Sequence, residues 1–121
     1  MKTALFIEDN RDIRENTTEM LELAGYHVFT ASNGEEGLRE VKRIHPDIIL
    51  CDVMMPVLNG YEVITHLKKD PATATIPVVC VSASVEKKEV AKAMELGAIG
   101  YLRKPFDETE LLNLLENTVG R

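Results

Sequence analysis

Two adjacent carboxylates, Glu8 and Asp9, directly follow the apolar residues "LFI" near the start of the chain. Repulsion and desolvation both oppose ending a buried strand in two negative charges unless a cation lies nearby. Three later apolar runs also end in a residue that could take part in chemistry: Asp52, Ser82 and Lys104. If these ends meet, the three carboxylates need a compensating cation. A hard divalent ion with oxygen ligands is the simplest candidate.

Mg²⁺ suits such a group because it accepts one or two carboxylates, keeps several waters and leaves a position for a phosphoryl oxygen. Lys104 could pair with a second phosphoryl oxygen, and Ser82 could hydrogen-bond a third. The acidic pair also has an ordinary interpretation as a solvated turn, in which Asp9 or Asn10 caps the next helix. Four converging strand ends with such residues are hard to explain as ordinary solvent-exposed polar residues, so the sequence favours a magnesium-dependent phosphoryl site.

The elements that must position these residues alternate along the chain. Short runs rich in β-branched and apolar residues predict five strands, at 3–8, 27–31, 47–52, 76–82 and 99–104. After each run, apolar residues recur at helical spacing and predict five helices. This alternation predicts an α/β fold, an open and mostly parallel sheet with helices on both faces. Ligands of such sheets bind beyond the carboxyl ends of the strands, where the candidate residues lie.

Length and composition limit the possible functions. The 121 residues suffice for one ordinary domain, and the net charge of −6 with scattered basic residues argues against nucleic-acid binding. The apolar runs, such as "IILC" at 48–51, are too short to span a membrane, and the amino terminus lacks a secretory signal pattern. Cys51 and Cys80 lie inside apolar runs, as buried thiols of a cytosolic protein would. We therefore expect a cytoplasmic protein without direct membrane contact.

Four segments together resemble the receiver domain of two-component response regulators. They are "IEDN" at 7–10, "DIILCDVMMPVLNGYEV" at 47–63, "VVCVSAS" at 78–84 and "GYLRKPF" at 100–106. The similarity covers essentially the whole chain, in the order and spacing of the family. It implies a single receiver domain over 1–121 with a flavodoxin-like fold, in which five parallel strands in the order 2-1-3-4-5 carry five helices on both faces.

The resemblance also implies roles for the acidic residues. Asp52 would be the phosphoacceptor and would attack a phosphohistidine on a histidine kinase or a histidine phosphotransfer protein. Asp9 would bind Mg²⁺ directly, Glu8 would act through a metal-bound water, and the backbone carbonyl of Met54 would supply a third protein ligand. The pair Glu8–Asp9 replaces the commoner Asp-Asp of the family, a change that leaves metal binding intact.

Three further residues would convert phosphorylation into a signal. Ser82 would hydrogen-bond the phosphoryl group, Lys104 would form an ion pair with it, and Tyr101 would turn inward as the switching aromatic. The bond between Lys104 and Pro105 is typically cis in the family. The switch would change a surface built from the fourth helix, the fifth strand and the fifth helix, which binds a downstream target protein. Such a domain catalyses its own phosphorylation and dephosphorylation but is not a turnover enzyme.

Other functions fit the sequence less well. An aspartate-nucleophile phosphatase would carry a second aspartate two residues after the nucleophile on the first strand, where Asn10 and Arg11 follow Asp9. A nucleotide-binding domain would need a glycine-rich loop after the first strand, and "EDNRDIREN" contains no glycine. Two alternatives stay open: a phosphorylation-independent interaction module, and a receiver that forms part of a larger regulator or hybrid kinase instead of a complete single-domain regulator.

Overall fold

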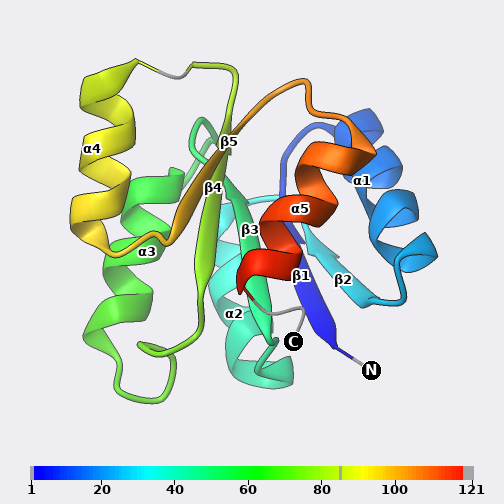
Figure 1. Ribbon diagram of the computed structural model, residues 1–121. Helices are drawn as coiled ribbons and strands as arrows, with labels where there is room; N and C mark the ends of the chain where they lie inside the picture. The colour runs from blue at the N-terminus through cyan, green and yellow to red at the C-terminus, as the bar shows by residue number, and fades with distance from the viewer. Residues whose placement is uncertain (1, 85, 119–121) are drawn as a thin grey trace.

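Strands and helices alternate through residues 2–84 and 86–118, the part of the chain that the computed structural model describes (Figure 1). The strands are β1 (Thr3–Ile7), β2 (His27–Ala31), β3 (Ile48–Asp52), β4 (Val78–Ser82) and β5 (Gly100–Arg103). The helices are α1 (Arg11–Leu23), α2 (Gly34–Ile44), α3 (Gly60–Lys69), α4 (Lys87–Leu96) and α5 (Glu108–Thr118). The strands pair in parallel in the order β2-β1-β3-β4-β5, which confirms the predicted fold.

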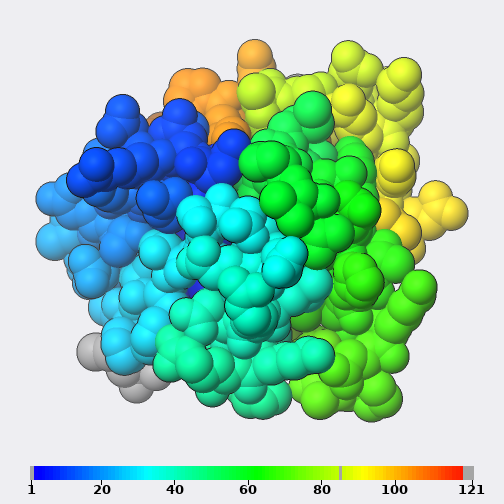
Figure 2. Space-filling view, turned by 180° about the vertical axis from the view of Figure 1, so that it is seen from behind, coloured from blue at the N-terminus to red at the C-terminus, as the bar shows by residue number. Residues whose placement is uncertain are grey.

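The sheet separates two apolar clusters because successive side chains of a strand point to opposite faces. In β1, Leu5 and Ile7 pack with side chains of α2, α3 and α4, whereas Ala4 and Phe6 pack with side chains of α1 and α5. Figure 1 shows α1 and α5 on one side of the sheet, and Figure 2 shows α2 (cyan-green) and α3 (green) on the surface of the other side. Both faces are therefore covered, which explains the nearly continuous apolar strands.

The two central strands β3 and β4 are buried along their whole length. Cys51 and Cys80 are neighbours in their register, and both are buried free thiols, as the sequence predicted. Burial raises the pKa of Cys80 to about 12, so this thiol stays protonated at neutral pH. Within the described ranges, no helix is long and apolar enough to cross a membrane.

Four of the five observed strands are one or two residues shorter than predicted, and β2 has the predicted bounds. β1 ends at Ile7 instead of residue 8, and β5 covers Gly100–Arg103 instead of 99–104. β4 begins after Pro77, which has no N–H to donate to a neighbouring strand. The differences leave the polar residues Glu8 and Lys104 just beyond the strands, at the edge of the sheet.

The turn after β3 requires a glycine where α3 begins. A Cβ on Gly60 would lie 2.6 Å from the carbonyl oxygen of Asp52 and 2.8 Å from Cα of Val53. The amide of Gly60 donates to the carbonyl of Val53 at 2.9 Å, and Asn59 caps the helix through a reciprocal hydrogen-bonded pair with Glu62. The start of α3 is thereby held directly against the end of the strand that carries Asp52.

Candidate functional site

Three carboxylates and one ammonium group meet at the carboxyl edge of the sheet. Glu8 and Asp9 follow β1, Asp52 ends the neighbouring strand β3, and one carboxylate oxygen from each lies within 4.8 Å of the others. Nζ of Lys104 lies 3.0 Å from Oε1 of Glu8 and 3.4 Å from Oδ2 of Asp52. The convergence predicted from the strand ends is therefore observed for these four residues.

The members of this acidic cluster, defined as Glu8, Asp9 and Asp52, differ in burial. Glu8 is fully buried and Asp52 is 2% exposed, whereas Asp9 is exposed to solvent. The side chain of Lys104 is 15% exposed. A ligand can therefore reach the cluster from the side of Asp9, while Glu8 forms its floor.

The ionisation of the cluster shows an excess of negative charge. Burial raises the pKa of Glu8 from 4.5 to about 7, and burial also raises the pKa of Asp52. Burial alone would lower the pKa of Lys104, but its hydrogen bond to Glu8 and the charge of Asp52 raise that pKa overall. One ammonium group does not offset three carboxylates, so the site favours either a proton on Glu8 or an additional cation.

Backbone amides hold the two buried carboxylates in place. Oδ1 of Asp52 accepts a hydrogen bond from the amide of Met54 at 3.2 Å, and Oε2 of Glu8 accepts one from the amide of Asn10 at 3.1 Å. Asn10 caps α1, as the ordinary interpretation of the acidic turn allowed. Capping and clustering of the carboxylates therefore occur together in one turn. The proposed role of the Met54 carbonyl stays a prediction.

Ser82 lies at the same edge but is not joined to the cluster. It ends β4, it is buried, and its Oγ accepts a hydrogen bond from the amide of Ser84 at 3.2 Å. The carbonyl of Ser82 accepts a hydrogen bond from the amide of Lys104 at 2.8 Å, which fixes the backbone of Lys104 beside the end of β4. The peptide bond between Lys104 and Pro105 is cis. Among the described residues no hydrogen bond links the Ser82 hydroxyl to a carboxylate of the cluster.

Tyr101 lies in β5, opposite Cys80 of β4. Its ring is half-buried against the core cluster on the α3 and α4 side, and its hydroxyl is buried without a hydrogen-bond partner among the described residues. Burial raises the pKa of this phenol. The hydroxyl end of the ring therefore lies inside the protein, and the switching role of Tyr101 stays a prediction.

One contact to the acidic turn was not predicted from the sequence. Arg14, on α1, donates from Nη1 to the carbonyl of Glu8 at 2.8 Å and lies 3.5 Å from the carbonyl of Asp9. A single arginine in the first turns of a helix has no pattern that distinguishes it from surface charge. Only the folded turn shows its contact.

The chain is similar to known proteins over nearly its whole length. The sequence model of the response regulator receiver domain matches residues 4–116. Relatives include the probable transcriptional regulator ycf29 of Pyropia yezoensis, 37% identical over 97% of this chain and 53% of that protein, and the protein PilH of Pseudomonas aeruginosa, 35% identical over 95% of each chain.

The fold is shared with solved structures. The receiver domain of a sensor histidine kinase from Pseudomonas aeruginosa PAO1, with a magnesium ion coordinated in its active-site cleft, has a TM-score of 0.91 and 28% identity. The alignment covers 99% of this chain and 98% of that domain. The chain spans about half the length of the first curated relatives it matches.

Proposed function

The chain belongs to the response regulator receiver domain family, and from that premise we propose that it accepts a phosphoryl group on Asp52 in a magnesium-dependent reaction. Receiver domains are signalling modules of two-component systems and do not turn over an external substrate. In this proposal residues 1–121 form one domain, and the phosphoryl donor is a phosphohistidine on a histidine kinase or histidine phosphotransfer protein. Phosphorylation then changes the affinity for a downstream target protein.

The observation that carries the proposal is the excess of carboxylates around Lys104. Three carboxylates with oxygen atoms within 4.8 Å and one ammonium group fit the oxygen ligands and charge that Mg²⁺ prefers. The raised pKa of Glu8 supports the same conclusion, because the buried cluster is stabilised by added positive charge. The solved receiver domain with magnesium in its cleft gives independent support by similarity.

Mg²⁺ would be held by Asp9, Asp52 and the Met54 carbonyl, with Glu8 acting through a water. When bound, the ion would neutralise charge on the phosphoryl oxygens and on the carboxylates. Among the three carboxylates Asp9 is the exposed one, so it is the first carboxylate that an entering ion meets.

The residues of the chain perform the transfer by position and charge. A carboxylate oxygen of Asp52 attacks phosphorus in line with the leaving imidazole, so that a P–O bond forms and the P–N bond breaks. The imidazole keeps the electron pair of the broken bond and takes a proton from water. Lys104, 3.4 Å from Asp52 before transfer, pairs with a phosphoryl oxygen afterwards.

The signal would leave the site through Ser82 and Tyr101. Ser82 would give up its contact with the amide of Ser84 and hydrogen-bond the phosphoryl group. The half-buried ring of Tyr101 would be held inward by this movement, and the surface of α4, β5 and α5 would change its affinity for the target. This surface is the partner site in the proposal because Tyr101 lies in β5 and packs against the cluster that contains Ala93 of α4.

Intact mass after incubation with acetyl phosphate tests the proposal. We expect one phosphoryl adduct in the presence of Mg²⁺, no adduct with a chelator, and no adduct on Asp52→Asn. The matched control Asp12→Asn removes an exposed carboxylate of α1 and should form the adduct normally. Because a short-lived adduct escapes detection, binding of beryllofluoride, a phosphoryl analogue, tests the same site in parallel. Neither adduct nor beryllofluoride binding would favour the phosphorylation-independent interaction module instead.

A further inference from the structure

Arg14 connects the first helix to the turn that presents the acidic cluster. Its side chain is half-buried, and Nη1 donates to the carbonyl of Glu8 at 2.8 Å while lying 3.5 Å from the carbonyl of Asp9. A guanidinium group suits this position because it is always charged and offers several donors in a rigid plane. One side chain therefore contacts the backbone of two consecutive residues of the cluster.

Arg14 donates to the carbonyl of Glu8 just after the last residue of β1, where the strand pairing ends. The amide of Glu8 still donates to the carbonyl of Ala31, the last residue of β2, at 3.0 Å. No backbone amide in residues 2–84 and 86–118 donates to the carbonyl of Glu8, so Arg14 supplies its partner. A buried carbonyl without a partner is destabilising, which favours the arrangement that Arg14 holds.

We propose that Arg14 is a positioning residue for the divalent-cation site. By fixing the carbonyls of Glu8 and Asp9, it sets the direction in which their carboxylates point toward Asp52. This inference rests on the proposed function, since it concerns the affinity of the same site for Mg²⁺. Residues that orient metal ligands typically change metal affinity by about 10–100-fold when they are replaced.

The positive charge of Arg14 and its contacts with the two carbonyls have opposite effects on the affinity of the site for Mg²⁺. A guanidinium near the cluster repels a divalent cation, so its removal alone would tighten binding. Loss of the two carbonyl contacts would loosen the turn and weaken binding. The sign of the change in the dissociation constant therefore separates a positioning role from a purely electrostatic one.

The test measures the Kd for Mg²⁺ from ¹⁵N–¹H NMR titrations with MgCl₂ at constant ionic strength. Arg14→Met and Arg14→Gln remove the charge and the reach to both carbonyls, and Arg14→Lys keeps the charge with fewer donors. The control Arg39→Met also removes one positive charge, from an exposed ion pair with Glu35 on α2 at 3.1 Å. The unfolding midpoint of each variant is recorded, so that a loss of stability is distinguished from a loss of affinity.

We expect the Kd for Mg²⁺ to rise about tenfold in both neutral Arg14 variants. In Arg14→Lys it should lie between these values and the wild-type value. In the control Arg39→Met it should stay within about twofold of wild type. An unchanged or lower Kd in the neutral variants overturns the proposal. If Arg14→Met does not fold, Arg14→Gln decides. Wild-type protein that shows no saturable Mg²⁺ binding contradicts the proposed function itself, whereas wild-type binding with unaffected variants overturns the role of Arg14 alone.

Discussion

Metal-free protein should lose free energy of unfolding as the pH rises from about 5 to about 8, and replacing Glu8 with glutamine should abolish most of this loss. Burial raises the pKa of Glu8 from 4.5 to about 7 in the folded protein. The folded state therefore binds this proton more tightly than the unfolded chain does. The stabilising contribution is complete below pH 4.5 and is lost as the pH rises through about 7.

The magnitude follows from the same two pKa values. Each pH unit between them is worth about 1.4 kcal/mol, so the loss has a ceiling of about 3 kcal/mol. Glutamine keeps the size of the buried side chain but carries no charge, and Lys104 can still pair with Asp52 at 3.4 Å. We expect the Glu8→Gln variant to lose about 1–3 kcal/mol less than wild type over this pH range.

Urea unfolding followed by far-ultraviolet circular dichroism, in the presence of a chelator, measures the loss for each protein. Subtracting the change with pH in the variant from that in wild type cancels the contributions of titrating groups that do not interact with Glu8. Glu95→Gln, which alters an exposed carboxylate of α4, should behave as wild type does. The reasoning is refuted if Glu8→Gln and wild type lose the same free energy of unfolding.

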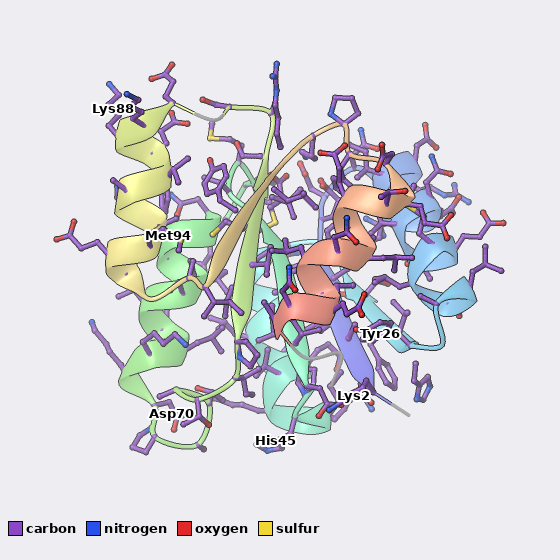
Figure 3. The ribbon with its side chains drawn as sticks, in the orientation of Figure 1. Lys2, Tyr26, His45, Asp70, Lys88 and Met94 are labelled. Carbon is purple, nitrogen blue, oxygen red and sulfur yellow. The ribbon has the colours of Figure 1, made fainter. Side chains whose placement is uncertain are left out.

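Three substitutions test the backbone and loop contacts, each by urea unfolding. Val57 has a φ of 72°, which strains a β-branched residue, so Val57→Asn should raise the free energy of unfolding by about 1 kcal/mol; a decrease would contradict this. Gly60→Ala should lower it by more than about 2 kcal/mol, because the new Cβ meets backbone at 2.6 Å, and unchanged stability would contradict the close approach. Lys68→Met removes an ammonium that donates to two carbonyls of the loop 70–77 and should cost about 1–2 kcal/mol. It should leave the Kd for Mg²⁺ unchanged, because Figure 3 places Asp70 of this loop at the opposite edge of the sheet; a weaker Kd would contradict that separation.

The strands and the site edge were predictable because their signals are local. Buried parallel strands produce continuous apolar runs, and the polar residue that ends each run marks the carboxyl edge. The sequence alone therefore predicts that Glu8, Asp9, Asp52 and Lys104 lie together, and the family resemblance implies the strand order. The ends of the strands were less well predicted, since a residue such as Glu8 can donate its amide to a neighbouring strand after the regular pairing has ended.

The remaining features depend on contacts between distant segments or on the local path of the backbone. The pairing of Lys104 with Glu8 joins residues 96 positions apart, and nothing in either segment indicates which carboxylate the ammonium prefers. The contact of Arg14 with two carbonyls depends on how α1 leaves the acidic turn. The positive φ of Val57 contradicts the ordinary preference of valine, so the surrounding turn imposes a conformation that local propensity does not predict.

The most direct test of the central claim is to locate the phosphoryl group on the chain. Borohydride reduces an aspartyl phosphate to homoserine, which peptide mass spectrometry assigns to a single position. After incubation with acetyl phosphate and Mg²⁺, we predict homoserine at position 52 and at no other aspartate, and none when Mg²⁺ is chelated. Reduction at Asp9 instead, or no reduction at position 52 in protein that binds Mg²⁺, would contradict the assignment of Asp52 as the phosphoacceptor.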